Sequence, residues 1–236
     1  MLNQELINQS SLVRMMPLKN KKEQNNLLVH EIYYSLQGES SYMGIPCVFI
    51  RTTGCHLRCF YCDTAHAFFE GQEFDVDDVV SKVLDYNIPL VELTGGEPLL
   101  QKASFELLQK LTDKGLTVLL ETSGGVSIQD VDRRVKVILD VKTPDSGQVN
   151  KNVWHNLDIL WPGCEVKFVI SSKNDYDFAK EICSKYNLYH KTHVLFSAAY
   201  NTIQHKQLAE YITTDKLNVR LQVQLHKILW GEERGK

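Results

Sequence analysis

Cys55-His-Leu-Arg-Cys59-Phe-Tyr-Cys62 is the stretch that decides the fold and chemistry predicted for this chain of 236 residues. It gathers three of the six cysteines into a C-x3-C-x2-C pattern, whereas Cys47, Cys164 and Cys183 are scattered. Cysteines this close together in a chain of this length bind a metal more often than they form a disulfide framework. The scattered three are predicted to be small core residues.

Three thiolates on one short loop can ligate three irons of a 4Fe–4S cluster and leave the fourth iron without a protein ligand. Such an iron can hold the amino and carboxylate groups of a small molecule, so the protein positions and the cofactor breaks the bond. Zinc held by the three cysteines and His56 or His66 is the alternative. An electron-transfer cluster would need a fourth cysteine nearby, and none is present.

Strands and helices alternate on both sides of this loop. Apolar, β-branched runs predict strands at 27–34, 47–52, 90–94, 118–120, 135–141, 166–170, 194–196 and 219–225. Between them, apolar residues at helical spacing predict helices, the first capped by Asp75 and another ending at Gly115. Further helices are predicted around residues 179–186 and 208–212.

Repeated strand–helix–strand units indicate a parallel sheet covered by helices. About six such units fall short of a closed eight-stranded barrel, so the fold predicted first is α/β, a partial (β/α)6-type open barrel. A doubly wound sheet is the alternative. In both, ligands bind at the C-terminal ends of the strands, where loops 94–98, 121–125 and 142–147 fall.

The amino-acid composition indicates the domain organisation and the general class of the protein. Residues 1–26 are polar and are predicted to form a flexible extension, and residues 27–236 a single catalytic domain. A hydrophobic fraction of 43% and a charged fraction of 23% are typical of a soluble globular protein. A net charge of -3 argues against a nucleic-acid partner. No apolar run reaches the roughly 20 residues of a membrane span or forms a signal peptide, so a cytoplasmic location is expected.

A second motif, Thr94-Gly95-Gly96-Glu97-Pro98, follows Cys62 by 32 residues at the end of a predicted strand. Glycines there allow a ligand to approach the backbone closely. Alone, the pair could be only a turn before a helix. Together with C-x3-C-x2-C and an aromatic at Tyr61, the motif resembles the radical S-adenosylmethionine (SAM) superfamily. That resemblance implies a 4Fe–4S cluster on Cys55, Cys59 and Cys62, with SAM at the open iron.

Further stretches are similar to the 7-carboxy-7-deazaguanine synthase family. They are Tyr34-Ser-Leu-Gln-Gly-Glu39, Gly44-Ile-Pro-Cys-Val-Phe-Ile-Arg51, Cys62-Asp-Thr64, Glu121-Thr-Ser-Gly124, Asp140-Val-Lys-Thr-Pro144 and Gln224-Leu-His-Lys227. The similarity runs from about residue 28 to residue 231. Ser40 stands where the family often has glycine, and no role is assigned to 197–199 or to His226.

This resemblance implies roles for individual residues. Those implied to contact SAM are Tyr61, Cys62, Asp63, Gly96, Ser123, Asp140, Val141 and Lys142. Those implied to contact the substrate are Leu36, Gln37, Gly38, Arg51 and Thr94. Arg51 suits a carboxylate because a guanidinium binds it bidentately, although a structural salt bridge is the alternative. Thr64 corresponds to a Mg²⁺ ligand, a site that substrate oxygens and water would have to complete. Asp63 could instead cap a turn.

The implied reaction is that of a lyase in queuosine and 7-deazapurine biosynthesis. A 5′-deoxyadenosyl radical takes hydrogen from 6-carboxy-5,6,7,8-tetrahydropterin, the ring contracts, ammonia leaves and 7-carboxy-7-deazaguanine forms. A flavodoxin or ferredoxin as external electron donor and a homodimer are implied as well. Two alternatives stay open, a glycyl-radical-enzyme activase and a non-catalytic zinc-binding interaction protein. An activase would not call for the Gln37–Glu39 segment or the C-terminal Gln-Leu-His-Lys.

Overall fold

A computed structural model describes residues 25–231, 233 and 235. The extension predicted over residues 1–26 lies outside the described residues, apart from its last two. Asn26 is already the first residue of strand β1 (Asn26–Leu36). The described part of the chain contains no helix long and apolar enough to span a bilayer.

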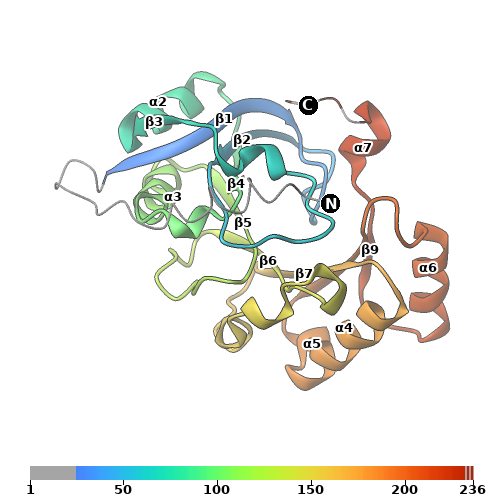
Figure 1. Cartoon of the computed structure of the whole chain (residues 1–236). Coiled ribbons are helices and arrows are strands. Elements are labelled where there is room, and N and C mark those ends of the chain that lie inside the picture. Colours follow the sequence, from blue (N-terminus) through green and yellow to red (C-terminus); the bar gives the residue numbers. More distant parts are fainter. Residues whose placement is uncertain (1–24, 232, 234, 236) are drawn as a thin grey trace.

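One curved nine-stranded sheet forms the centre of the molecule (Figure 1). Its other strands are β2 (Pro46–Thr52), β3 (Gln72–Asp75), β4 (Leu90–Gly95), β5 (Thr117–Thr122), β6 (Lys136–Asp140), β7 (Glu165–Ile170), β8 (His193–Ala198) and β9 (Arg220–Gln222). The spatial order is β3-β1-β2-β4-β5-β6-β7-β8-β9. Strands β2 to β9 run parallel, and β1 runs antiparallel to both β2 and β3. With β3 and β9 as its two edges, the sheet confirms the predicted open barrel.

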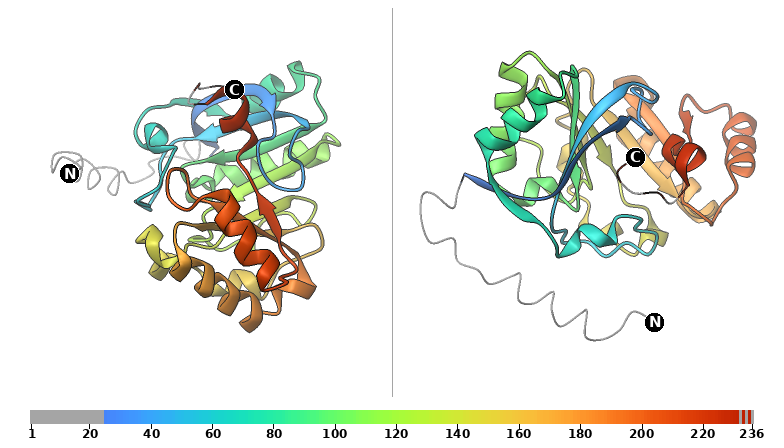
Figure 2. Two further views of the ribbon diagram at one scale, coloured as in Figure 1. Left: turned by 90° about the vertical axis from the view of Figure 1, so that its right-hand side faces the viewer. Right: turned by 90° about the horizontal axis from the view of Figure 1, so that it is seen from above.

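Helices cover the outside of this curved sheet (Figure 2). They are α2 (Val76–Asp85), α3 (Ala103–Asp113), α4 (Lys173–Lys185), α5 (Leu188–Lys191) and α6 (His205–Thr214), with α7 (Leu225–Trp230) near the C-terminus. Short 3₁₀ turns are η2 (Ala65–Phe68), η3 (Pro98–Leu100), η4 (Pro144–Ser146), η5 (Val149–Lys151) and η6 (Trp154–Leu157). The predicted cap of α2 is confirmed, because the Asp75 carboxylate accepts from the Asp77 N–H at 2.8 Å.

Two crossovers differ from the predicted strand–helix alternation. No α-helix lies between β5 and β6, or between β6 and β7. Buried apolar side chains of these loops, Ile128, Val131 and Leu157, cover the sheet instead. The Asn156 side chain accepts from the Ile128 N–H at 3.1 Å and donates to the Val126 carbonyl at 2.8 Å. It therefore satisfies backbone groups that a helix would have satisfied internally.

The predicted last strand, 219–225, is also too long. Strand β9 ends at Gln222, and Leu225 begins helix α7. Gln224 lies outside the sheet, and its side-chain amide donates at 2.9 Å to Glu39, in the loop that follows β1.

Alternate residues of the strands divide the core into two layers, as the two-residue repeat of a strand requires. Val48, Ile50 and Val91 face outward, toward the helices, in the large cluster. Cys47, Phe49, Leu90, Leu119 and Ile138 form a smaller cluster on the opposite face. Phe49 and Ile138 of this inner layer also line the main cavity, so the inner layer is its apolar floor. Cys47, Cys164 and Cys183 are buried, which confirms their predicted core role.

Candidate active site

A cavity of about 480 Å³ opens at the C-terminal ends of the parallel strands. Residues predicted for the site that line it are Leu36, Gln37, Gly38, Arg51, Cys55, Cys59, Tyr61, Cys62, Asp63, Thr64, Thr94, Gly96, Ser123, Asp140 and Lys142. Val141 is the exception. Its side chain packs in the large hydrophobic cluster, and its N–H donates to the Lys167 carbonyl at 2.8 Å. Alternation along the chain turns the Val141 side chain away from the cavity, and the contact of Val141 with SAM stays a prediction.

The cysteine loop is fastened to the body of the protein at both ends. The Gly54 N–H donates to the Ala67 carbonyl in η2 at 2.9 Å, and the Phe60 N–H donates to the Ser146 carbonyl at 3.2 Å. Leu57 is buried beneath the loop. Cys55, Cys59 and Cys62 are partly buried free thiols. The backbone thus presents three sulfurs from one loop to one cavity.

The spacing of these sulfurs favours a cluster over a single metal ion. Tetrahedral zinc with bonds to sulfur of about 2.3 Å would bring its thiolates to about 3.8 Å from one another. Among residues 25–231, 233 and 235, the one group of three metal-ligating residues whose ligand atoms all lie within 4.8 Å is His30, Glu31 and His66. At least one pair of the three cysteine sulfurs is therefore more than 4.8 Å apart, wider than one tetrahedral zinc ion would hold its thiolates.

The thiols are protonated while no metal is bound. Burial raises the pKa of Cys55 to about 11 and raises the pKa of Cys59 and Cys62 above the usual thiol value. Because a metal binds the thiolate, binding at this loop releases protons.

The second motif packs directly on the start of the cysteine loop. Strand β4 ends at Gly95, whose φ of 148° is a backbone conformation that favours glycine. A Cβ on Gly96 would lie 2.1 Å from the Gly54 carbonyl oxygen, and the neighbouring Glu97 N–H donates to that oxygen at 2.8 Å. Only glycine at position 96 allows the two segments to approach this closely.

Glu97, quoted in the motif without a role, ties the ends of β4 and β5 together. Its buried carboxylate accepts from the Thr122 hydroxyl at 2.9 Å, the Ser123 N–H at 2.8 Å and the Leu99 N–H at 3.0 Å. The Ser123 segment is thereby held beside Gly96, as expected for two parts of one binding site.

Two buried polar atoms at the cavity wall lack a partner among the described residues. They are the Tyr61 hydroxyl and Asp140 Oδ1. The other Asp140 oxygen accepts from Lys142 Nζ at 2.6 Å. Buried polar atoms in proteins are nearly always hydrogen-bonded, so this wall is built to receive a polar ligand. A nucleoside cofactor such as SAM fits these residues.

Deeper in the cavity, acidic residues surround one buried lysine. Lys167 Nζ lies 2.9 Å from Glu39 and also donates to Glu121. Glu92 accepts from the Gln37 amide, and burial, with Glu121 and Glu39 nearby, raises the pKa of Glu92 well above its usual range. The raised pKa favours the neutral form of Glu92, whereas the Glu39 and Glu121 carboxylates pair directly with Lys167.

This polar cluster was missed as a site from the sequence. Glu92 and Lys167 stand inside otherwise apolar strands, β4 and β7. Burying a charged residue in a strand costs free energy unless the residue has a partner. The position of Glu92 and Lys167 within apolar strands was therefore the signal that could have indicated a buried polar cluster.

Arg51 forms the structural salt bridge that was one of its two predicted interpretations. Its Nε lies 2.7 Å from Glu31, directly opposite on β1, and its Nη2 donates to the Tyr33 hydroxyl at 3.0 Å. The same side chain lines the cavity. The salt bridge thus orients a guanidinium that faces the ligand space.

The C-terminal segment joins edge strand β9 to the loop that follows β1 and so completes the cavity wall. The Gln222 and Gln224 amides each donate to Glu39 at 2.9 Å, and the Leu225 N–H donates to the Gly38 carbonyl at 2.9 Å. The His226 ring packs so tightly on Gly38 that a Cβ there would lie 2.3 Å from Nδ1. His226, to which no role was assigned, therefore lines the cavity beside Gly38.

Comparisons with known proteins identify a family. The model of the radical SAM superfamily matches residues 49–197. A 7-carboxy-7-deazaguanine synthase of Chlorobaculum tepidum is 40% identical over 210 residues, which cover 88% of this chain and 96% of that protein. One from Koribacter versatilis is 41% identical over 220 residues, covering 87% and 97%.

Solved structures share the fold. The crystal structure of QueE from Escherichia coli superposes with a TM-score of 0.67 at 19% identity, covering 85% of this chain and 95% of that one. Archaeal TYW1 superposes with a TM-score of 0.56 at 14% identity, covering 93% and 90%.

Proposed function

The chain belongs to the 7-carboxy-7-deazaguanine synthase family of the radical SAM superfamily, and we propose that it converts 6-carboxy-5,6,7,8-tetrahydropterin to 7-carboxy-7-deazaguanine. The ring contracts and ammonia is lost, so the enzyme is a lyase of queuosine and 7-deazapurine biosynthesis. One observation carries the proposal: the cysteine loop, the Gly95–Gly96 strand end and Arg51 line the same cavity.

The family uses a 4Fe–4S cluster and SAM. When bound, the cluster supplies the electron that cleaves SAM and so starts the radical chemistry. Cys55, Cys59 and Cys62 would hold the cluster. The close packing of Gly96 on Gly54 would keep the SAM-binding strand end at a constant distance from those cysteines.

The remaining SAM contacts would come from residues around the cysteine loop and at the ends of two neighbouring strands. Tyr61 and Asp63 flank the third cysteine, while Ser123, Asp140 and Lys142 come from the ends of β5 and β6. The unpartnered hydroxyl of Tyr61 and the free Asp140 oxygen would accept or donate hydrogen bonds to the polar groups of this cofactor.

The pterin would lie between β1 and the polar cluster. Arg51 would bind its carboxylate, and Leu36, Gln37, Gly38 and Thr94 would contact the ring. The Glu121 carboxylate lines the same space and accepts from the Thr94 hydroxyl at 3.3 Å, which suits it to the N–H groups of a pyrimidine edge. A cavity of about 480 Å³ has the size of typical small-molecule sites.

Magnesium would bind at Thr64, with substrate oxygens and water as further ligands. The Thr64 hydroxyl donates to Asp63 at 2.8 Å and lines the cavity, so a small shift would turn its oxygen toward a bound ion. An external flavodoxin or ferredoxin would supply electrons. A homodimer in the cytoplasm is the expected state of the enzyme.

The direct test is an anaerobic assay with the pterin, SAM, Mg²⁺ and dithionite. We expect formation of 7-carboxy-7-deazaguanine, identified by mass, together with release of ammonia. Cleavage of SAM without the deazapurine would refute the proposed substrate. A matched Cys59→Ala variant should bind less iron and form no product.

A further inference from the structure

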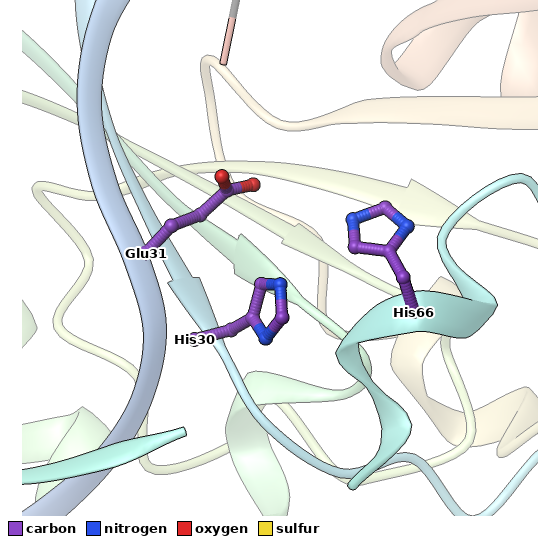
Figure 3. Close-up of side chains that lie close together, drawn as sticks. All are labelled: His30, Glu31 and His66. Carbon is purple, nitrogen blue, oxygen red and sulfur yellow. The ribbon is translucent and has the colours of Figure 1, made fainter. Parts of the chain in front are cut away.

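A second group of metal-ligating side chains lies beside the cavity, apart from the cysteines. His30 and Glu31 come from strand β1, and His66 comes from turn η2 (Figure 3). One potential ligand atom of each lies within 4.8 Å of those of the other two. In Figure 3 the three side chains point toward a common space between the strand and the turn. All three residues are partly buried.

A bulge in β1 is the reason that two consecutive residues serve this group. Side chains of neighbouring strand residues normally point to opposite faces. Here Val29 pairs with Thr52 and Glu31 pairs with Arg51, so His30 is one extra residue on β1. Bulges of this kind re-aim a side chain and are frequent beside active sites. The shift turns His30 to the same side as Glu31, where a regular strand would have separated them.

The His30 ring is already oriented as a metal ligand. Its Nδ1 lies 2.7 Å from the Glu70 carbonyl oxygen, which can only accept, so Nδ1 carries the proton. The other nitrogen, Nε2, is then the one with a lone pair. A histidine that ligates a metal usually donates its second N–H to a carbonyl or carboxylate in this way.

Glu31 has a second carboxylate oxygen that can act as a metal ligand. Its Oε1 lies 2.7 Å from Arg51 Nε, and a carboxylate has about four lone-pair sites on two oxygens. Two neutral imidazoles and one carboxylate already paired with a guanidinium carry little negative charge. This ligand set suits a metal that imidazole binds strongly, such as zinc, over Mg²⁺ or Ca²⁺, which prefer oxygen.

We propose that His30, Glu31 and His66 bind one divalent transition-metal ion of the zinc class. Three protein ligands leave a tetrahedral ion one open position, as in catalytic zinc sites. Glu31 and His66 also line the main cavity, so the ion sits at its edge. The ion joins η2, which follows the cysteine loop, to strand β1. The Glu31 carboxylate binds both the ion and Arg51. This site is independent of the proposed reaction.

The test measures zinc in anaerobically purified, cluster-containing full-length protein. After Zn²⁺ is added and excess removed by gel filtration, we expect one zinc per chain with unchanged iron. His30→Asn and His66→Asn should each weaken zinc binding at least about tenfold in a chelator competition. His205→Asn, an exposed histidine at the start of α6, is the control and should bind zinc like the wild type.

X-ray absorption at the zinc edge of the wild-type protein separates this site from the cysteines, even if a variant fails to fold. We expect only nitrogen and oxygen ligands, at about 2.0–2.2 Å. Sulfur at about 2.3 Å would place the zinc on the cysteine loop and overturn the proposal. Equal zinc affinity in wild type, His30→Asn and His66→Asn would overturn it too. A histidine variant that binds zinc more weakly but still forms the deazapurine would support the zinc site and would leave the proposed function unaffected.

Discussion

Replacing Gly96 by alanine tests the contact between the two motifs. The new Cβ would lie 2.1 Å from the Gly54 carbonyl oxygen and 3.0 Å from the Cys55 Cβ, whereas ordinary contact begins at 3.4 Å. The strand end and the cysteine loop must therefore separate by about 1.3 Å. That movement also strains the hydrogen bond of 2.8 Å from the Glu97 N–H to the Gly54 carbonyl.

Gly96→Ala is expected to lower both the stability and the activity of the protein, and the two effects differ in size. Overpacking in a tight contact costs about 1–3 kcal/mol of unfolding free energy. A misplacement of about 1 Å between reacting groups can lower turnover by about 100-fold. Because the shift separates the SAM-binding strand end from the cluster loop, we expect kcat/KM to fall far more than stability alone would explain.

Gly115→Ala is the matched control. Gly115 has a φ of 82° with nothing within 4 Å of a new Cβ, so alanine there costs about 1–2 kcal/mol of backbone strain away from the site. Urea unfolding gives the stability of both variants, and anaerobic assays with iron analysis give their activity and cluster content. If Gly96→Ala keeps the iron and turnover of Gly115→Ala, the contact does not position the cluster and the reasoning is refuted.

Three further variants test the polar cluster and the magnesium proposal. Lys167→Met leaves Glu39 and Glu121 buried without their cation and should cost about 3–5 kcal/mol in urea unfolding; an unchanged midpoint would contradict the ion pairs. The raised pKa of Glu92 makes wild-type stability fall as pH rises above the usual carboxyl value of 4.5. Glu92→Gln should flatten that fall across a pH series, and parallel curves would argue against a raised pKa of Glu92. Thr64→Val should raise the Mg²⁺ concentration for half-maximal activity at least about tenfold, whereas Thr64→Ser should not.

The positions of the strands could be predicted from the sequence because buried parallel strands are continuous apolar runs. The same local pattern says nothing about which loop will hold a helix. The crossovers containing Ile128 and Leu157 are covered by irregular backbone whose hydrogen bonds depend on Asn156, a contact between segments distant in the sequence.

For the site, too, local motifs predicted some residues, whereas residues that depend on distant parts of the chain were missed. The residues predicted from motif similarity nearly all line one cavity; Val141 is the exception, because alternation along the chain turns its side chain into the hydrophobic cluster. It did not reveal that Glu92 and Lys167 face inward, since their partners come from other strands. The His30–Glu31–His66 group depends on one extra residue in β1, which no spacing rule predicts.

The last wall of the cavity has a consequence for how the protein is made. Glu39 receives two of its hydrogen bonds from Gln222 and Gln224, which are 183 and 185 positions later in the chain. During translation, the cysteine loop leaves the ribosome long before these glutamines exist. The contacts that complete this side of the cavity therefore cannot form until nearly the whole chain has been synthesised.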